Sequence, residues 1–324
     1  MRVLQWSRRN TGDGGAAAMG ITLYETFRAV FYTPFYLAHA LGAYAAEGVD
    51  VALTSSPALN YQASHLADED ANVYWGGPMR LMVGHDRDPE SPIVGFCEVV
   101  TRDPFFLVGR EPRPDFRFAD LLDLRFASVS EVPTPWMCLQ DDLRRAGLDP
   151  AAVNRVTDGT MPGNAAALRE GRFDVIQLFQ PFVEQLVSAG DGHIWHAAAT
   201  RGPCSYTTFY APRSTLRRRA DELFRMTRAM YRTQKWLYSH AADETVAAVA
   251  GFFPDVSRAI LAACVDRYLA LGIWGRNPRL PRDGFVRLHD AMLSGGLIKK
   301  RVSYETCVDT AFADRAIAED PPSL

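Results

Sequence analysis

The residues from Thr26 to Leu53 constrain the fold most, because they contain a loop, a helix and a strand in a fixed order. Thr22–Thr26 predicts a short buried strand, and an aromatic loop follows it. Pro34 suits the first turn of a helix, and Gly48 can end that helix in a left-handed conformation. Val49–Leu53 predicts a second strand. The order strand, loop, helix, strand is typical of a parallel βαβ unit, whose ligand side is the loop after the first strand.

A spaced pattern of residues lies on the helix of this unit. Pro34, Ala38 and Gly42 recur at helical spacing, and Glu47–Val51 reads EGVDV. This pattern resembles the opening of the solute-binding proteins of ABC importers, in the branch that carries nitrate, taurine, sulfonates and thiamine-pyrimidine precursors. The yeast-type thiamine-pyrimidine synthases share that fold. A later segment, Ala167–Val175, resembles the same family, so the resemblance extends along most of the chain.

The resemblance implies an α/β protein with two domains and the type II periplasmic-binding-protein fold. In that fold a hinged cleft lies between two mixed sheets, and the C-terminal tail is helical. A length of 324 residues agrees with two domains at a prior of ~150 residues each. Arg102-Asp103-Pro104 separates two predicted strands and suits a hinge. We expect a flexible tail at residues 1–19, a first domain at 20–103 and 211–324, and a second domain at 104–210.

Four predicted helices begin at a proline shortly after a predicted strand, namely at Thr33-Pro34, Gly77-Pro78, Thr134-Pro135 and Gln180-Pro181. In a parallel sheet such helices begin at the carboxyl ends of the strands, where the unpaired N–H groups of the first turn attract negative charge. Two such edges that face each other across a hinge form a cleft suited to an oxygen-bearing small molecule. Proline begins helices in any α/β protein, so the prediction depends on the recurrence and on the family-like opening.

Aromatic and polar side chains gather on and near these loops. Two aromatic rings that face each other across a cleft can hold a flat ligand ring by stacking, and Tyr32 and Trp75 are the first candidates. Polar side chains nearby would orient the ligand. The predicted ligand-binding residues are Phe31, Tyr32, Thr33, Asn60, Trp75, Gly76, Gly77, Thr101, Ser130, Glu131, Thr134, Gln177, Phe179 and Gln180.

No motif in the sequence builds a catalyst. The nucleophile-elbow, Walker, zinc-protease and EF-hand patterns are absent, and His193-x-x-His196 lies at the end of a predicted strand. We therefore predict no metal site and no cofactor. The synthases that the chain resembles carry a lysine and a histidine after the third strand and a cysteine cluster before the returning strand. Here Tyr74–Arg80 contains neither lysine nor histidine, and Gly202–Tyr206 contains one cysteine.

The resemblance implies a receptor that binds a small organic ligand, either aromatic or heterocyclic or sulfonate-like, and that works with an ABC permease. The alternative is a cytoplasmic enzyme on the same fold, related to thiamine-pyrimidine biosynthesis, and the missing motifs favour the receptor. The enzyme requires two titratable groups that meet in the cleft, for which the candidates are Glu25, Glu98, Glu131 and His65.

The composition limits the classes of partner that the protein is expected to bind. A net charge of −3 indicates no nucleic-acid partner, and no apolar run of ~18 residues predicts a membrane span. The five cysteines are scattered, which favours buried thiols in a reducing compartment. Met1–Gly20 lacks the apolar core of a signal peptide. We expect a cytoplasmic location, or a periplasmic one if the start is misassigned or a signal is missing.

Overall fold

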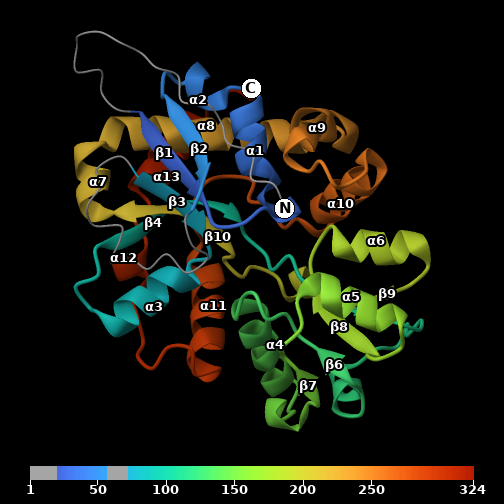
Figure 1. Cartoon of the computed structure of the whole chain (residues 1–324). Coiled ribbons are helices and arrows are strands. Elements are labelled where there is room, and N and C mark those ends of the chain that lie inside the picture. The colour runs from blue at the N-terminus through green and yellow to red at the C-terminus, as the bar shows by residue number, and fades with distance from the viewer. Residues whose placement is uncertain (1–19, 57–71) are drawn as a thin grey trace.

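The computed structural model of the chain describes residues 20–56 and 72–324, which form two lobes around two separate sheets (Figure 1). The tail at residues 1–19, the predicted site residue Asn60 and the candidate base His65 lie outside the described residues. The limits of the two domains, given above as residue ranges, stay a prediction.

The first sheet has the strand order β2-β1-β3-β10-β4. In it β1 runs parallel to β2 and β3, whereas β10 runs antiparallel to β3 and β4. The sheet is therefore mixed, and its parallel edge pair β1 and β2 confirms the predicted βαβ unit. Its strands are β1 (Ile21–Glu25), β2 (Val51–Ser55), β3 (Asn72–Gly76), β4 (Ile93–Val100) and β10 (Thr207–Pro212).

The second sheet has the strand order β7-β6-β8-β5-β9. It is also mixed, because β6 runs parallel to β7 and β8 while β5 runs antiparallel to β8 and β9. Its strands are β5 (Phe106–Gly109), β6 (Phe126–Ala127), β7 (Arg155–Val156), β8 (Val175–Leu178) and β9 (His193–Ala197). Two mixed sheets were expected from the sequence, and the expectation is confirmed.

The chain crosses between the lobes twice, through residues 101–105 and residues 202–206, which we call the outgoing and the returning linker. The two linkers lie side by side. The amide of Cys204 donates to the carbonyl of Thr101 at 2.9 Å, and the amide of Tyr206 donates to the carbonyl of Val100 at 2.8 Å. The returning linker leads into β10, which joins the first sheet as the sequence predicted.

The helix of the βαβ unit is interrupted, contrary to the single helix predicted from Pro34 to Gly48. It consists of α1 (Thr33–Ala40) and α2 (Ala43–Ala46). Between them Gly42 has a φ of 66°, a left-handed conformation that ends the first helix. Gly48 is also left-handed, with a φ of 70°, so the predicted end of the helical segment is correct.

The remaining helices divide between the two lobes (Figure 1). A 3₁₀ helix, Phe118–Leu122, follows β5. The second lobe contains α4 (Thr134–Arg145), α5 (Met161–Arg169) and α6 (Phe182–Ala189). The first lobe contains α3 (Met79–Arg87), α7 (Arg213–Arg218), α8 (Ala220–Ser239), α9 (Ala242–Val249), α10 (Arg258–Leu271), α11 (Arg282–Ser294), α12 (Tyr304–Cys307) and α13 (Ala311–Glu319).

The C-terminal helices pack mainly on the first lobe, where α8 lies against α1, α2 and α13. Two of them also reach the second lobe. Helix α11 lies beside α4, and α10 lies beside α6. The tail therefore covers the first sheet and also touches the second lobe on either side of the linkers.

Candidate functional site

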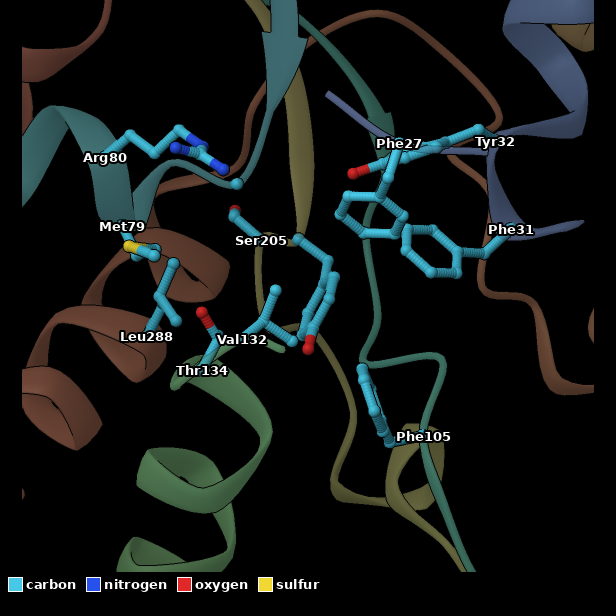
Figure 2. Close-up of a pocket in the computed structure, with 12 residues that line it drawn as sticks. Phe27, Phe31, Tyr32, Met79, Arg80, Phe105, Val132, Thr134, Ser205 and Leu288 are labelled. Atoms are coloured by element: carbon cyan, nitrogen blue, oxygen red, sulfur yellow. The ribbon is translucent and has the colours of Figure 1, made fainter. Parts of the chain in front are cut away.

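A cavity of about 40 Å³ lies where the two lobes and the two linkers meet (Figure 2). By volume it holds a few water molecules or a small group. Residues of both lobes border it, together with side chains from both linkers. Its lining consists of Phe27, Phe31, Tyr32, Gly77, Met79, Arg80, Phe105, Val132, Thr134, Ser205, Tyr206 and Leu288.

The N-termini of three helices reach this cavity. Tyr32 immediately precedes α1, Gly77 and Met79 stand at the start of α3, and Thr134 is the first residue of α4. None of these three ends has a side-chain cap, and the helix dipole gives each end a partial positive charge. At α1 the amides of Tyr32 and Thr33 already donate to the carbonyls of Ala29 and Val30, so this end contributes through its dipole and not through unpaired N–H groups. The sequence predicted four such ends around one cleft, and three of them border the cavity.

One end of the cavity is polar. Figure 2 shows the guanidinium of Arg80, the phenol oxygen of Tyr32 and the hydroxyl of Ser205 turned toward a common region. Burial raises the pKa of the Tyr32 phenol, although the charge of Arg80 and the hydroxyl of Thr207 oppose the rise. Tyr32 therefore keeps its proton at neutral pH. A guanidinium, a phenol O–H and a hydroxyl together can donate several hydrogen bonds to one anion.

The absence of a side chain at Gly76 leaves space for the Arg80 side chain. A Cβ atom at Gly76 would lie 3.2 Å from Nε of Arg80 and 3.3 Å from the ring of Tyr210. Because Gly76 has no side chain, the Arg80 side chain passes close to the backbone here; the predicted ligand contact of Gly76 stays a prediction.

The other end of the cavity is aromatic, and its rings come from both lobes. Phe179, at the end of β8, stacks on Phe27 with ring centroids 6.2 Å apart and an interplanar angle of 19°. It meets Phe31 and Phe105 edge to face, each at 5.1 Å between centroids. Tyr206 adds an edge contact to Phe31 at 6.2 Å. The facing rings predicted from the sequence exist, but here they pack on one another.

Four predicted site residues border the cavity, namely Phe31, Tyr32, Gly77 and Thr134. Phe179 lies directly behind them in the aromatic cluster. These residues come from loops that follow β1, β3, β6 and β8, so the rule that loops at strand ends meet at one edge predicted them correctly in space.

Other predicted residues of the first lobe have packing roles. Trp75 is fully buried, stacks on Phe35 with centroids 4.4 Å apart and does not border this cavity, so its role as a ligand contact stays a prediction. Thr33 is buried and donates its hydroxyl to the carbonyl of Val30 at 2.6 Å. Thr101 lies in the outgoing linker, and its amide donates to the carbonyl of Ile273 at 2.7 Å.

The polar side chains predicted as ligand contacts in the second lobe form hydrogen bonds to neighbouring groups of the protein. The Glu131 carboxylate accepts from the amides of Met161, at 2.8 Å, and of Ser130, at 3.1 Å. Gln177 donates to the carbonyl of Pro135 at 3.1 Å. Gln180 bonds Glu184 through both side-chain atoms, which occupies the start of α6 and keeps this fourth helix end away from the cavity.

Sequence reasoning missed several residues of the lining. Phe105, Ser205 and Tyr206 lie on the linkers, and Leu288 comes from α11, which is remote in the sequence. Arg80 is the second residue of α3, so its place shortly after β3 was a usable signal. The contribution of α11 required knowledge of how the C-terminal helices pack.

The structure does not bring the candidate catalytic carboxylates together. Glu25 is held by Arg28 and accepts from the Tyr36 phenol at 2.9 Å. Glu98 is buried on β4, and burial raises its pKa to about 8, opposed by the hydroxyls of Ser205 and Thr101. Neither borders the cavity, nor does Glu131. Within residues 20–56 and 72–324, no cluster of three or more His, Cys, Asp or Glu side chains could hold a metal ion.

The comparisons with known proteins agree on the fold. A family model described as the NMT1-like family matches residues 115–251. The curated relative "Putative binding protein YtlA" of Bacillus subtilis (strain 168) is 24% identical over 301 residues, which cover 92% of this chain and 90% of YtlA. The resemblance seen in the sequence is confirmed.

Two solved structures of other proteins have a similar fold. The sulfonate-binding protein SsuA from Methylobacillus flagellatus KT, described as a periplasmic component of a putative sulfonate ABC transporter, superposes with a TM-score of 0.72 at 14% identity, covering 93% of this chain and 94% of that one. The desulfurization enzyme DszB superposes with a TM-score of 0.68 at 16% identity, covering 94% and 100%. In the part of this chain that the structure describes, none of the helices has the length and apolar character to cross a membrane.

Proposed function

We propose that this protein is a receptor that binds a small organic anion in the cavity between its lobes and closes on it. The observation that carries the proposal is the convergence of three helix N-termini, of α1, α3 and α4, with the Arg80 guanidinium and the Tyr32 phenol. Helix N-termini and a guanidinium both favour an oxyanion such as a sulfonate or carboxylate.

The aromatic end of the cavity supports an organic ligand over an inorganic ion. Phe27 and Phe31 from the first lobe and Phe105 from the outgoing linker all pack on Phe179 of the second lobe. When the lobes separate, a ligand's apolar part would contact these rings. Because the cavity of about 40 Å³ is small, the lobes must separate to admit a ligand with a ring. The linkers at residues 101–105 and 202–206 would act as the hinge.

The relatives supply the wider role. YtlA is named as a binding protein, and SsuA is described as a component of an ABC transporter. By this analogy the receptor would deliver its ligand to an ABC permease. The enzyme DszB shares the fold, but among the described residues neither a carboxylate nor a thiol borders the cavity of this chain, which favours binding without chemistry.

Calorimetric titration with ethanesulfonate, benzenesulfonate, taurine and nitrate tests the proposal. We expect at least one organic anion to bind, and Arg80→Gln to weaken it by roughly tenfold or more, because a charge-assisted hydrogen bond is lost. Arg87→Gln, at the exposed far end of the same helix α3, is the matched control and should bind like the wild type. The recovered ligand should be chemically unchanged.

Binding of none of the four anions, or equal binding by wild type and Arg80→Gln, would overturn the proposal. If the recovered ligand is chemically changed, the protein is an enzyme and the receptor proposal is wrong.

A further inference from the structure

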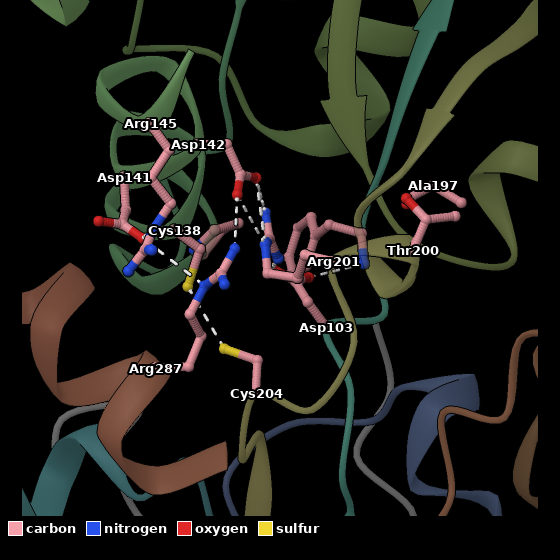
Figure 3. A network of polar contacts seen from close by, with 12 residues as sticks. Asp103, Cys138, Asp141, Asp142, Arg145, Ala197, Thr200, Arg201, Cys204 and Arg287 are labelled. Carbon is pink, nitrogen blue, oxygen red and sulfur yellow. Dashed lines mark hydrogen bonds and ion pairs between the residues drawn. The ribbon is translucent and has the colours of Figure 1, made fainter. Parts of the chain in front are cut away.

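A cluster of buried charges lies beside the cavity, between the linkers and α4 (Figure 3). Arg201, just before the returning linker, contacts Asp103 of the outgoing linker at 2.5 Å. Its Nε also donates to both carboxylate oxygens of Asp142 on α4, at 3.1 and 3.2 Å. The side chains of Arg201, Asp103 and Asp142 are at most 6% exposed. The cluster therefore joins the outgoing linker to the second lobe.

The charges of this cluster do not balance within the second lobe and its linkers. Asp141 neighbours Asp142 on α4 and pairs with Arg145 at 2.6 Å. Three carboxylates, those of Asp103, Asp141 and Asp142, thus share the guanidinium groups of Arg145 and Arg201. One negative charge is left over.

The nearby titratable groups do not supply the missing charge. Burial lowers the pKa of His196 to about 4, so this imidazole is neutral at pH 7. Asp290 on α11 adds another carboxylate near Arg145, but it pairs with Arg301 at 3.5 Å.

The compensating charge comes from the first lobe. Arg287 on α11 contacts Asp142 at 3.4 Å and Asp141 at 3.6 Å, and its side chain is 27% exposed. The next residue, Leu288, borders the cavity, as does Thr134 at the start of α4. The ion pairs between α11 and α4 therefore lie one residue away from the ligand site on the α11 side.

We propose that Arg287 is a closure latch, which neutralises the surplus negative charge of Asp141 and Asp142 only when the lobes are closed. This inference rests on the proposed function, which supplies the ligand. The latch would determine the apparent affinity for that ligand. An equilibrium shifted away from the closed form lowers the apparent affinity in proportion to the closed fraction. A partly exposed ion pair is also screened by salt, so high ionic strength should favour the open form.

Solution scattering of Arg287→Gln tests the latch without any ligand. We expect this variant to have a larger radius of gyration than the wild type at about 0.05 M salt. Raising the salt to about 0.5 M should enlarge the wild type toward the variant and leave the variant unchanged. Arg282→Gln is the matched control, because Arg282 is on the same helix, is 60% exposed and pairs with Glu305 inside the first lobe.

Calorimetry with ethanesulfonate gives the second measurement. We expect Arg287→Gln to bind roughly three- to tenfold more weakly than the wild type and Arg287→Lys to recover part of the loss. A second ion pair between the lobes, from Arg267 of α10 to Glu184 of α6, is unchanged in all these variants, so the comparison isolates Arg287.

Equal radii of gyration for wild type and Arg287→Gln at both salt concentrations would overturn the latch, even if the anion binds. If ethanesulfonate binds to none of the proteins, its failure counts against the proposed function, and the scattering comparison alone decides the latch.

Discussion

Among single residues, Glu98 gives the clearest dependence on pH. Its folded pKa of about 8 is caused first by burial, whereas the pKa of an unfolded glutamate is about 4.3. Between these values the folded state keeps the proton and the unfolded state releases it, so the free energy of unfolding falls as pH rises.

The free energy of unfolding of the wild type should fall by up to about 1.4 kcal/mol per pH unit in this range. We expect Glu98→Gln to lack this fall and to be more stable than the wild type near pH 7.5. Urea unfolding at several pH values measures this. The exposed Glu90→Gln is the control, and a Glu98→Gln profile parallel to that of the wild type would refute the argument.

Trp75 shows the limit of residue-level prediction. The sequence predicts this indole at the end of a strand, Val73–Trp75, near the cleft, but strand position alone does not tell which face of the sheet it occupies. In the structure it is fully buried against Phe35 and Tyr36. We expect Trp75→Ala to cost about 3–5 kcal/mol of unfolding free energy.

Phe27→Ala is the comparison for Trp75→Ala, because Phe27 is only partly buried and borders the cavity. It should cost clearly less stability in urea unfolding and should weaken anion binding. An unchanged unfolding midpoint for Trp75→Ala would favour a ligand contact for Trp75 over a packing role.

At the scale of elements, the sequence predicted the strands and most helix starts, because proline, glycine and apolar periodicity act locally. It missed the break between α1 and α2, since a single glycine within a helical pattern does not reveal its own φ. It also placed the start of α6 at the cleft, whereas the Gln180–Glu184 bonds occupy it. Contacts such as Leu288 of α11 beside Thr134 of α4 depend on the packing of distant segments.

The break at Gly42 has a measurable cost. Gly42 has a φ of 66° and open space around it, so alanine there is strained by its backbone alone. We expect Gly42→Ala to lower the unfolding free energy by about 1 kcal/mol in urea. Gly251 also has open space but no left-handed φ, and Gly251→Ala should be neutral or slightly stabilising. Equal effects of the two substitutions would contradict the explanation of the break.

At the scale of the whole molecule, two sheets are joined by two adjacent linkers, and the ligand site lies where all of them meet. The sequence predicted this arrangement through the order of its elements and its resemblance to solute-binding proteins. It did not predict the polar end formed by Arg80 and Ser205, because that end brings a residue of α3 beside the returning linker, and the two are remote in the sequence. The account's central claim is that the lobes close on an organic anion.

Small-angle scattering of the wild-type protein, without ligand and saturated with an anion that calorimetry shows to bind, tests this claim most directly. The account predicts a smaller radius of gyration at saturation, because the aromatic rings and the α4–α11 ion pairs meet only when the lobes are closed. Identical scattering with and without the bound anion would show that binding does not close the lobes, and it would contradict the account.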